Sequence, residues 1–153
     1  MLKLNRLPIS LMAVMALAAV PFVLLSGCAG EVSVTTASLS EATMYTSIDP
    51  KTQQPLDKGD IYPVDAEAFY CSVKLSNAPA DTAVSAQWFY IQGEETSLNN
   101  YLIDETSVTS GGTGYIGFSL ARGSQSPAWP KGDYAVKLFV DGKEKITVPF
   151  KVQ

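Results

Sequence analysis

Two neighbouring runs of the chain decide its fold class: Phe69-Tyr-Cys-Ser-Val-Lys-Leu75 and Val84-Ser-Ala-Gln-Trp-Phe-Tyr90. In each run every second residue is apolar, which is the period of a β-strand with one face buried. The segment Asn77-Ala-Pro-Ala-Asp81 between them is rich in residues that interrupt strands. The sequence therefore predicts two successive strands, over 69–75 and 84–90, joined by a turn.

The same two-residue period extends on both sides of these runs. Further strands are predicted over 37–44, 101–109, 115–121, 134–140 and 146–152, and no long amphipathic helical pattern is found after residue 36. In the first of these strands the alternation slips by one residue around Glu41, which indicates a β-bulge. Ile116, Phe118 and Leu120 are predicted to point inward in the strand over 115–121.

Turn residues separate the predicted strands. Gly111-Gly112 is predicted to end one strand and begin the next, and Asp141-Gly142 is a strong signal for a two-residue hairpin. Pro149 cannot donate a hydrogen bond to a neighbouring strand, so the last strand is predicted to lie at a sheet edge on the side that Pro149 faces. The segments 49–63 and 122–132 are predicted to be loops.

Seven short strands of this kind predict an all-β fold, an antiparallel two-sheet sandwich over residues 37–153. The chain resembles an immunoglobulin-like domain, in which Cys71, Trp88 and Tyr134 stand where such domains carry a cysteine, a buried tryptophan and a corner tyrosine. The second cysteine of those domains is replaced by Val136, so packing would take the place of the disulfide. The segment from Trp129 to Tyr134, followed by a strand, Asp141-Gly142 and a final strand, also looks like the closing hairpin of sandwich domains in prokaryotic lipoproteins.

The N-terminal segment has the layout of an export signal. Lys3 and Arg6 precede an uncharged run over 7–25, and Leu25-Ser26-Gly27-Cys28 follows. These four residues resemble the lipobox of bacterial lipoproteins. The resemblance implies a signal peptide over 1–27 that is helical and removed, a diacylglycerol and further acyl lipid on Cys28, and a short flexible spacer over 28–36.

Two other interpretations of this segment remain: a plain cleaved signal peptide, or an uncleaved membrane anchor. Pro8 and Pro21 interrupt the apolar run, and neither interpretation accounts for Cys28. The lipobox resemblance implies a chain attached to the extracytoplasmic face of a membrane in the cell envelope. Ala29 in place of an aspartate is compatible with an outer-membrane location where the host has an outer membrane.

The charge of the mature chain limits which ligands it can bind, and its cysteine content limits which disulfides it can form. Removing residues 1–27 takes away Lys3 and Arg6 but none of the 15 acidic residues, so the net charge moves from −4 to −6. Nucleic acid and anionic lipid surfaces are recognised by basic patches, so neither is an expected ligand of the mature domain. With Cys28 acylated, Cys71 has no partner within the chain and is predicted to be a buried thiol.

The residues of common catalytic sites are scarce in this chain. It contains no histidine, which removes Ser-His-Asp and Cys-His pairs, and it has no glycine-rich phosphate loop. A catalytic carboxylate pair of the glycosidase type could be drawn from any of the 15 acidic residues, but no motif singles out two of them. We therefore expect no enzyme, no metal and no cofactor besides the covalent lipid. Asp49, Asp57, Asp60 and Asp65 could supply oxygen ligands to calcium, but such turn residues more often cap the backbone.

The best candidate for a binding face lies on the outward sides of the predicted strands over 84–90 and 134–140. Phe89 and Phe139 are expected to form an apolar patch there, flanked by Gln87 and Lys137. Alternatively, the 49–63 insert or the segment 99–104 covers these rings. The favoured function is a non-catalytic module that binds or adheres to a protein or glycan. The alternative is a structural accessory of an envelope or secretion complex, pairing its last strand with another subunit's edge.

Overall fold

The computed structural model describes residues 36–52, 54–124 and 126–153. The predicted signal peptide, the lipobox and the spacer up to residue 35 lie outside the described residues. The described part is built from strands, with one short 3₁₀ turn, η1 (Thr96–Leu98), so the predicted all-β fold is confirmed. No helix within these residues has the length and apolar character needed to span a bilayer.

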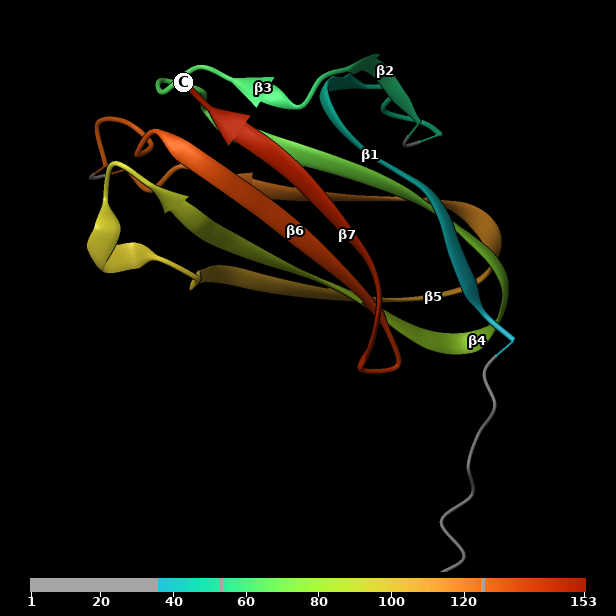
Figure 1. Ribbon diagram of the computed structural model, residues 1–153. Helices are drawn as coiled ribbons and strands as arrows, with labels where there is room; N and C mark the ends of the chain where they lie inside the picture. The colour runs from blue at the N-terminus through green and yellow to red at the C-terminus, as the bar shows by residue number, and fades with distance from the viewer. Residues whose placement is uncertain (1–35, 53, 125) are drawn as a thin grey trace, which may run out of the picture. The chain divides into compact units, whose positions relative to one another are not determined.

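The strands form one curled sheet (Figure 1). They are β1 (Ser38–Ile48), β2 (Pro55–Lys58), β3 (Ile61–Tyr62), β4 (Ala68–Gly93), β5 (Tyr101–Ala121), β6 (Gly132–Val140) and β7 (Lys143–Val152). Their order is β2-β1-β4-β6-β7-β3, and β5 pairs with β4 outside this path. All of the pairings are antiparallel except that of β3 with β7, which is parallel.

Two long bent strands give the sheet its curl. The first part of β4 pairs with β1 and with the end of β5, whereas its second part pairs with β6 and with the start of β5. The prediction that turns at 77–81 and 111–112 end these strands is wrong. Asn77, Asp81 and Gly112 adopt positive φ angles of 53°, 63° and 80°, and the register shifts nearby. These residues bend the strands locally while the pairing continues on either side.

The segment 49–63 is not the irregular loop that its composition predicts. Within it, β2 pairs with β1 and β3 pairs with the end of β7. Tyr62 of β3 is buried, and its hydroxyl donates a 2.8 Å hydrogen bond to the carbonyl of Tyr45. Strands of four and two residues are too short to show a period, and their partners lie far away in the sequence, which explains the wrong prediction.

Three other local predictions are confirmed. Glu41 has a φ of 52° at a register shift in β1, and this bulge brings its carboxylate to 2.9 Å from the Lys74 ammonium. Asp141 and Gly142, with φ of 48° and 76°, form the turn between β6 and β7. On its second side β7 pairs only through Lys151 and Val152, so among described residues no strand pairs with Pro149 there.

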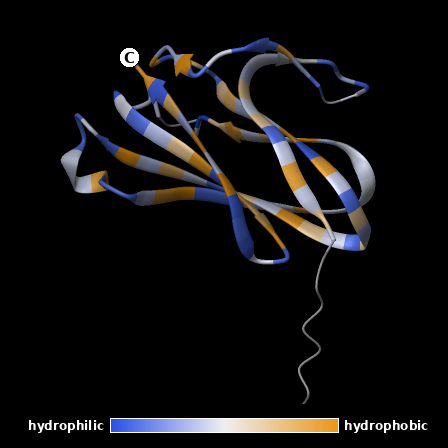
Figure 2. Ribbon diagram, turned by 45° about the vertical axis from the view of Figure 1, so that its right-hand side comes forward, coloured by the Kyte–Doolittle hydropathy of each residue, from blue (hydrophilic) through white to orange (hydrophobic). Residues whose placement is uncertain are grey.

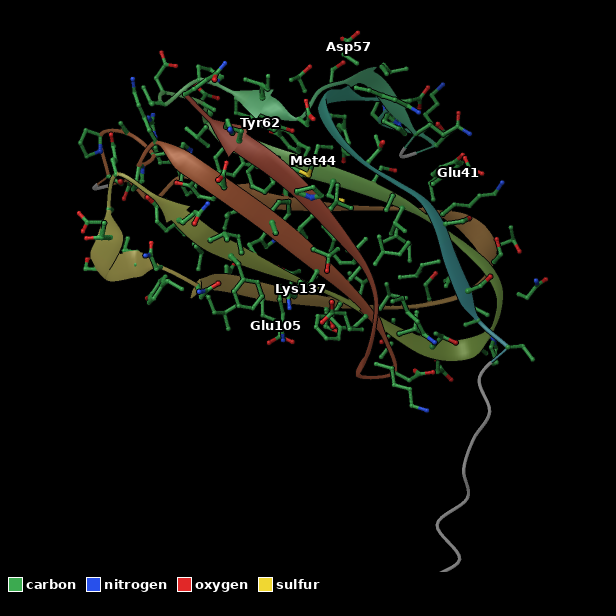
Figure 3. The ribbon with its side chains drawn as sticks, in the orientation of Figure 1. Glu41, Met44, Asp57, Tyr62, Glu105 and Lys137 are labelled. Atoms are coloured by element: carbon green, nitrogen blue, oxygen red, sulfur yellow. The ribbon has the colours of Figure 1, made fainter. Side chains whose placement is uncertain are left out.

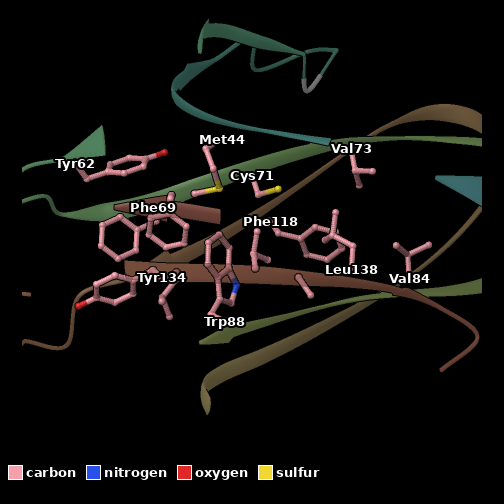
Figure 4. Packing of buried hydrophobic residues seen from close by; sticks show 14 of the residues in the cluster. Met44, Tyr62, Phe69, Cys71, Val73, Val84, Trp88, Phe118, Tyr134 and Leu138 are labelled. Carbon is pink, nitrogen blue, oxygen red and sulfur yellow. The ribbon is translucent and has the colours of Figure 1, made fainter. Parts of the chain in front are cut away.

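The core fills the concave side of the sheet (Figures 2 and 4). Phe69, Cys71, Val73 and Leu75 from the first part of β4 are at most 1% exposed, as predicted from their alternation. Most of the rest of the cluster comes from the second part of β4 and from β5, β6 and β7: Val84, Ala86, Trp88, Tyr90, Phe118, Leu120, Tyr134, Val136, Leu138, Val140, Phe150 and Val152. Figure 4 shows Cys71 and Trp88 within this cluster.

Candidate binding face

An apolar row crosses the outer face of four strands. On β4, Phe89 lies opposite Leu102 of β5 on one side and Ala135 of β6 on the other. Ala135 in turn lies opposite Pro149 of β7. Residues directly opposite each other in antiparallel strands point to the same face, so the four side chains form one row. Leu102 is 41% exposed, Pro149 is exposed and Phe89 is half-buried, whereas Ala135 is buried, so solvent reaches the row at three of its four residues.

A polar row lies beside the apolar one on the same face, two residues further along the strands. Gln87 donates a 3.2 Å hydrogen bond from Nε2 to Glu105 Oε2, and it lies opposite Lys137. The Lys137 ammonium lies 5.4 Å from the centroid of the Phe89 ring and 3.4 Å from Glu144 Oε2. Figure 3 shows Glu105 and Lys137 on the same side of the sheet. The Lys137 ammonium therefore contacts both rows, and its contact with the face of the Phe89 ring is a favourable cation–π interaction.

The predicted apolar patch of Phe89 and Phe139 is wrong in its arrangement. Phe139 lies opposite Ser85, four residue pairs away from the pair that contains Phe89. Four residues correspond to about 13 Å along a strand, and the polar pair of Gln87 and Lys137 lies between the two rings on this face. Both rings are on the outer face, as expected, and both are half-buried. The apolar neighbours of Phe89 come instead from strands β5 and β7, whose register could not be read from sequence.

The charges on this face are fixed by local contacts. A hydrogen bond from Thr147 lowers the pKa of the Glu144 carboxyl, and the neighbouring Lys137 ammonium lowers it further. Glu144 is therefore ionised at neutral pH, and it offsets the positive charge of Lys137. The face consequently offers an aromatic and aliphatic row beside a polar row of one ammonium and two carboxylates, which suits a neutral ligand surface better than a strongly charged one.

A second candidate is an aromatic cavity of about 220 Å³ at one end of the core, lined by Tyr90, Leu98, Tyr101, Ile103, Ser126, Trp129, Pro130 and Tyr134. Three of the aromatic side chains that line the cavity donate hydrogen bonds to backbone carbonyl oxygens. Tyr134 donates from its hydroxyl to Pro130 O at 2.7 Å, Trp129 donates from Nε1 to Ala66 O at 2.8 Å, and Tyr90 donates to Lys131 O at 3.2 Å. The sequence identified Trp129 and Tyr134 only as fold residues, because the cavity joins segments that are distant in the chain.

Cys71 is buried and unpaired, as predicted. Burial raises the pKa of its thiol to about 12. The thiolate is the reactive form of cysteine, so this side chain is not a nucleophile at neutral pH. Cys71 therefore belongs to the core and contributes no chemistry to either candidate site.

The aspartates that were considered as calcium ligands are not brought together. Asp49 accepts hydrogen bonds from the backbone amides of Lys51 and Thr52 at 2.8 and 2.9 Å, and these bonds lower the pKa of its carboxyl. Asp57 accepts one from the Ser47 hydroxyl at 2.7 Å. In the described ranges no three His, Cys, Asp or Glu side chains are grouped to hold a metal ion. The contacts of Asp49 are the backbone capping that turn residues commonly provide.

Comparison with known proteins gives structural likeness only. No protein-family model and no curated protein matches the chain. It is similar to part of alkylpurine DNA glycosylase AlkC of Pseudomonas fluorescens bound to DNA (14% identity, TM-score 0.47), covering 76% of this chain and 30% of that one.

Two glycosidases show a comparable likeness. A β-glucosidase of Listeria innocua has 10% identity, a TM-score of 0.49, and coverage of 78% and 16%. The β-D-glucoside glucohydrolase of Trichoderma reesei has 14% identity, a TM-score of 0.45, and coverage of 78% and 19%. This chain thus spans less than a third of the length of each of these proteins, and the candidate sites rest on its own geometry.

Proposed function

We propose that this protein is an envelope lipoprotein whose β domain is a non-catalytic binding or adhesion module for a protein or glycan. The observation that carries the proposal is the segment Leu25-Ser26-Gly27-Cys28, placed directly after an uncharged run with a basic head. Acylation of Cys28 would hold the domain at the extracytoplasmic face of the membrane. Two or more acyl chains make such attachment durable, because each buried methylene contributes about 0.8 kcal/mol.

We further propose that the domain is an immunoglobulin-like sandwich in which the bent strands β4 and β5 contribute to both layers. The Tyr134 hydroxyl bonds to the backbone four residues upstream, at Pro130, which is the contact made by a corner tyrosine. Cys71, Trp88 and Val136 are each fully buried, at the positions where such domains place a disulfide and its tryptophan. Apolar packing supports the core at these positions.

The anchor is tested by replacing the proposed acylated residue. In Cys28→Ser, we expect the chain to leave the membrane fraction or to keep its N-terminal segment, since no thiol is present to accept the lipid. Cys71→Ala, which removes the buried thiol instead, should stay membrane-bound and serves as the matched control. Intact mass of detergent-extracted protein is the measurement. A mature chain beginning at Cys28 with no added acyl mass would refute the lipoprotein assignment.

The binding face is tested with two half-buried phenylalanines that differ in their neighbours. Phe89→Ser removes the centre of the apolar row, whereas Phe139→Ser changes a ring of the same face outside it. We expect only Phe89→Ser to reduce the amount of partner that is crosslinked to the anchored protein on intact cells. The reason is that apolar contacts at the centre of an interface carry most of its affinity. Melting temperatures should fall by similar amounts in both variants.

Three outcomes of this experiment are informative. Equal crosslinking by Phe89→Ser and the unchanged protein would exclude this face as the site of contact. A stoichiometric envelope subunit as the crosslinked partner would support the structural accessory role in place of adhesion. A collapse of the melting temperature in Phe89→Ser alone would show that the ring belongs to the core.

A further inference from the structure

Strand β5 presents a long unpaired edge. It pairs with β4 along its whole length, from Tyr101 to Ala121, and no other strand of the described residues pairs with its second side. Alternate residues of β5 therefore direct backbone N–H and C=O groups away from the sheet. Such a row of unpaired groups is a template for another strand.

The other exposed edges are protected, and this one is not. The free side of β7 carries Pro149 and the charged run over 143–145, both of which discourage strand pairing. The edge strands β2 and β3 have only four and two residues. From 106 to 121, by contrast, β5 contains no charged residue and no proline. A continuous, uncharged edge of this length is typical of an interaction surface rather than of a solvated one.

The ends of β5 carry opposite charges. Asp104 and Glu105 lie near its start, and Arg122 follows its last residue. A second copy of the strand running antiparallel would bring the basic end of one copy to the acidic end of the other. A parallel copy in register would place like charges together, which is unfavourable. The Arg122 guanidinium donates through one N–H group to Pro127 O, and it has further N–H groups for a carboxylate.

The alternation of β5 is also compatible with its own antiparallel copy. Ile116, Phe118 and Leu120 face the core in its second part, and Thr106, Val108 and Ser110 are the less exposed residues of its first part. A two-fold axis through Thr113 places residues of the two parts opposite each other: Thr106 opposite Leu120, Val108 opposite Phe118, and Ser110 opposite Ile116. The inward faces of the two copies would then match, and Asp104 would lie opposite Arg122. Because this axis is normal to the sheet, both copies would curl toward the same side.

We propose that two copies of this chain associate by antiparallel pairing of their β5 edges about Thr113. The two curled sheets then become one continuous sheet across the two-fold axis. The contact uses backbone groups and the outward Ser and Thr side chains of β5. It therefore does not cover the part of the apolar row that lies on β4, β6 and β7. The inference does not depend on the identity of any external ligand.

The pairing predicts which residues of two copies are close. Ser107 and Ser119 are both exposed, and they lie opposite each other across the proposed axis. In the full chain kept in its native membrane, Ser107→Cys combined with Ser119→Cys should give covalent dimers with a short bismaleimide. Cys71 is buried and stays unreactive. Ser119→Cys alone is the matched control, because in the proposed pairing the residue opposite each Ser119 is Ser107 of the other copy and not its Ser119.

Charge variants at the same positions test the contact without crosslinking. Ser107→Lys with Ser119→Lys places lysines opposite each other and should abolish the dimer seen in sedimentation of the detergent-extracted full chain. Ser107→Glu with Ser119→Lys makes opposite pairs and should retain it. The proposal is overturned if the double cysteine variant gives only monomer, if Ser119→Cys alone crosslinks as well, or if both charge variants sediment alike.

Discussion

Replacing Phe69 with alanine is expected to lower the free energy of unfolding by about 3–5 kcal/mol, enough to unfold a large fraction of a marginally stable domain. Phe69 is fully buried at the centre of the aromatic part of the core. Its ring centroid lies 4.4 Å from that of Trp129, 4.9 Å from that of Tyr62 and 4.9 Å from that of Phe150. One side chain thus connects β4 to β3, β7 and the segment before β6.

The size of this effect follows from the packing around the ring. The three neighbouring rings are held from several directions, so they cannot all move inward to fill the space that alanine would leave. Trp129 in particular is fixed by its hydrogen bond to Ala66, and Tyr62 by its bond to Tyr45. The cost therefore includes the cavity as well as the lost transfer of apolar surface from water.

Denaturant unfolding of the full chain, followed by tryptophan fluorescence, measures this loss. Phe139→Ala is the matched control: it removes the same ring from the outer face, where the side chain is half-buried and outside the core cluster. The control should cost only about 1 kcal/mol, because a half-buried ring removes less apolar surface from water and leaves no closed cavity when it is truncated. Equal losses in the two variants would contradict the assignment of Phe69 as the centre of the core.

Local patterns in the sequence identified most strands and their buried faces. The alternation in Phe69-Tyr-Cys-Ser-Val-Lys-Leu75 gave the inward residues correctly, because burial of one face imposes a period of two on the strand itself. The turn chemistry of Asp141-Gly142 and the slip at Glu41 were equally local. Such features depend on a few consecutive residues, so a single sequence contains them.

Features that depend on distant pairing were not predictable. Asn77 and Asp81 look like the ends of a turn, yet strands β5 and β6 continue the pairing beyond them and β4 is only bent. The same limit applies to the binding face. Phe89 and Phe139 were placed correctly on the outer side, but the register of β4 against β6 separates them and brings Leu102 and Pro149 into line with Phe89 instead. Register is set by partner strands, which no single strand specifies.

Trp88 is expected to respond very differently to its two simplest replacements. Its side chain is fully buried, with the Phe150 ring centroid 6.0 Å away, so Trp88→Ala should cost about 3–5 kcal/mol through the cavity that it leaves. The indole Nε1 has no hydrogen-bond partner among the described residues. A buried donor without a partner carries a penalty of about 1–3 kcal/mol, which Trp88→Phe would remove.

The phenylalanine variant keeps one aromatic ring in the core and eliminates the unpaired N–H group, so part of the lost packing is offset. We expect Trp88→Phe to change the free energy of unfolding by less than half as much as Trp88→Ala. Trp129 remains as the fluorescent probe in both variants, and their denaturant slopes should stay equal to that of the unchanged chain. If Trp88→Phe costs as much as Trp88→Ala, then the full indole, including its N–H group, is needed at this position. That result would place a hydrogen-bonding partner beside Nε1.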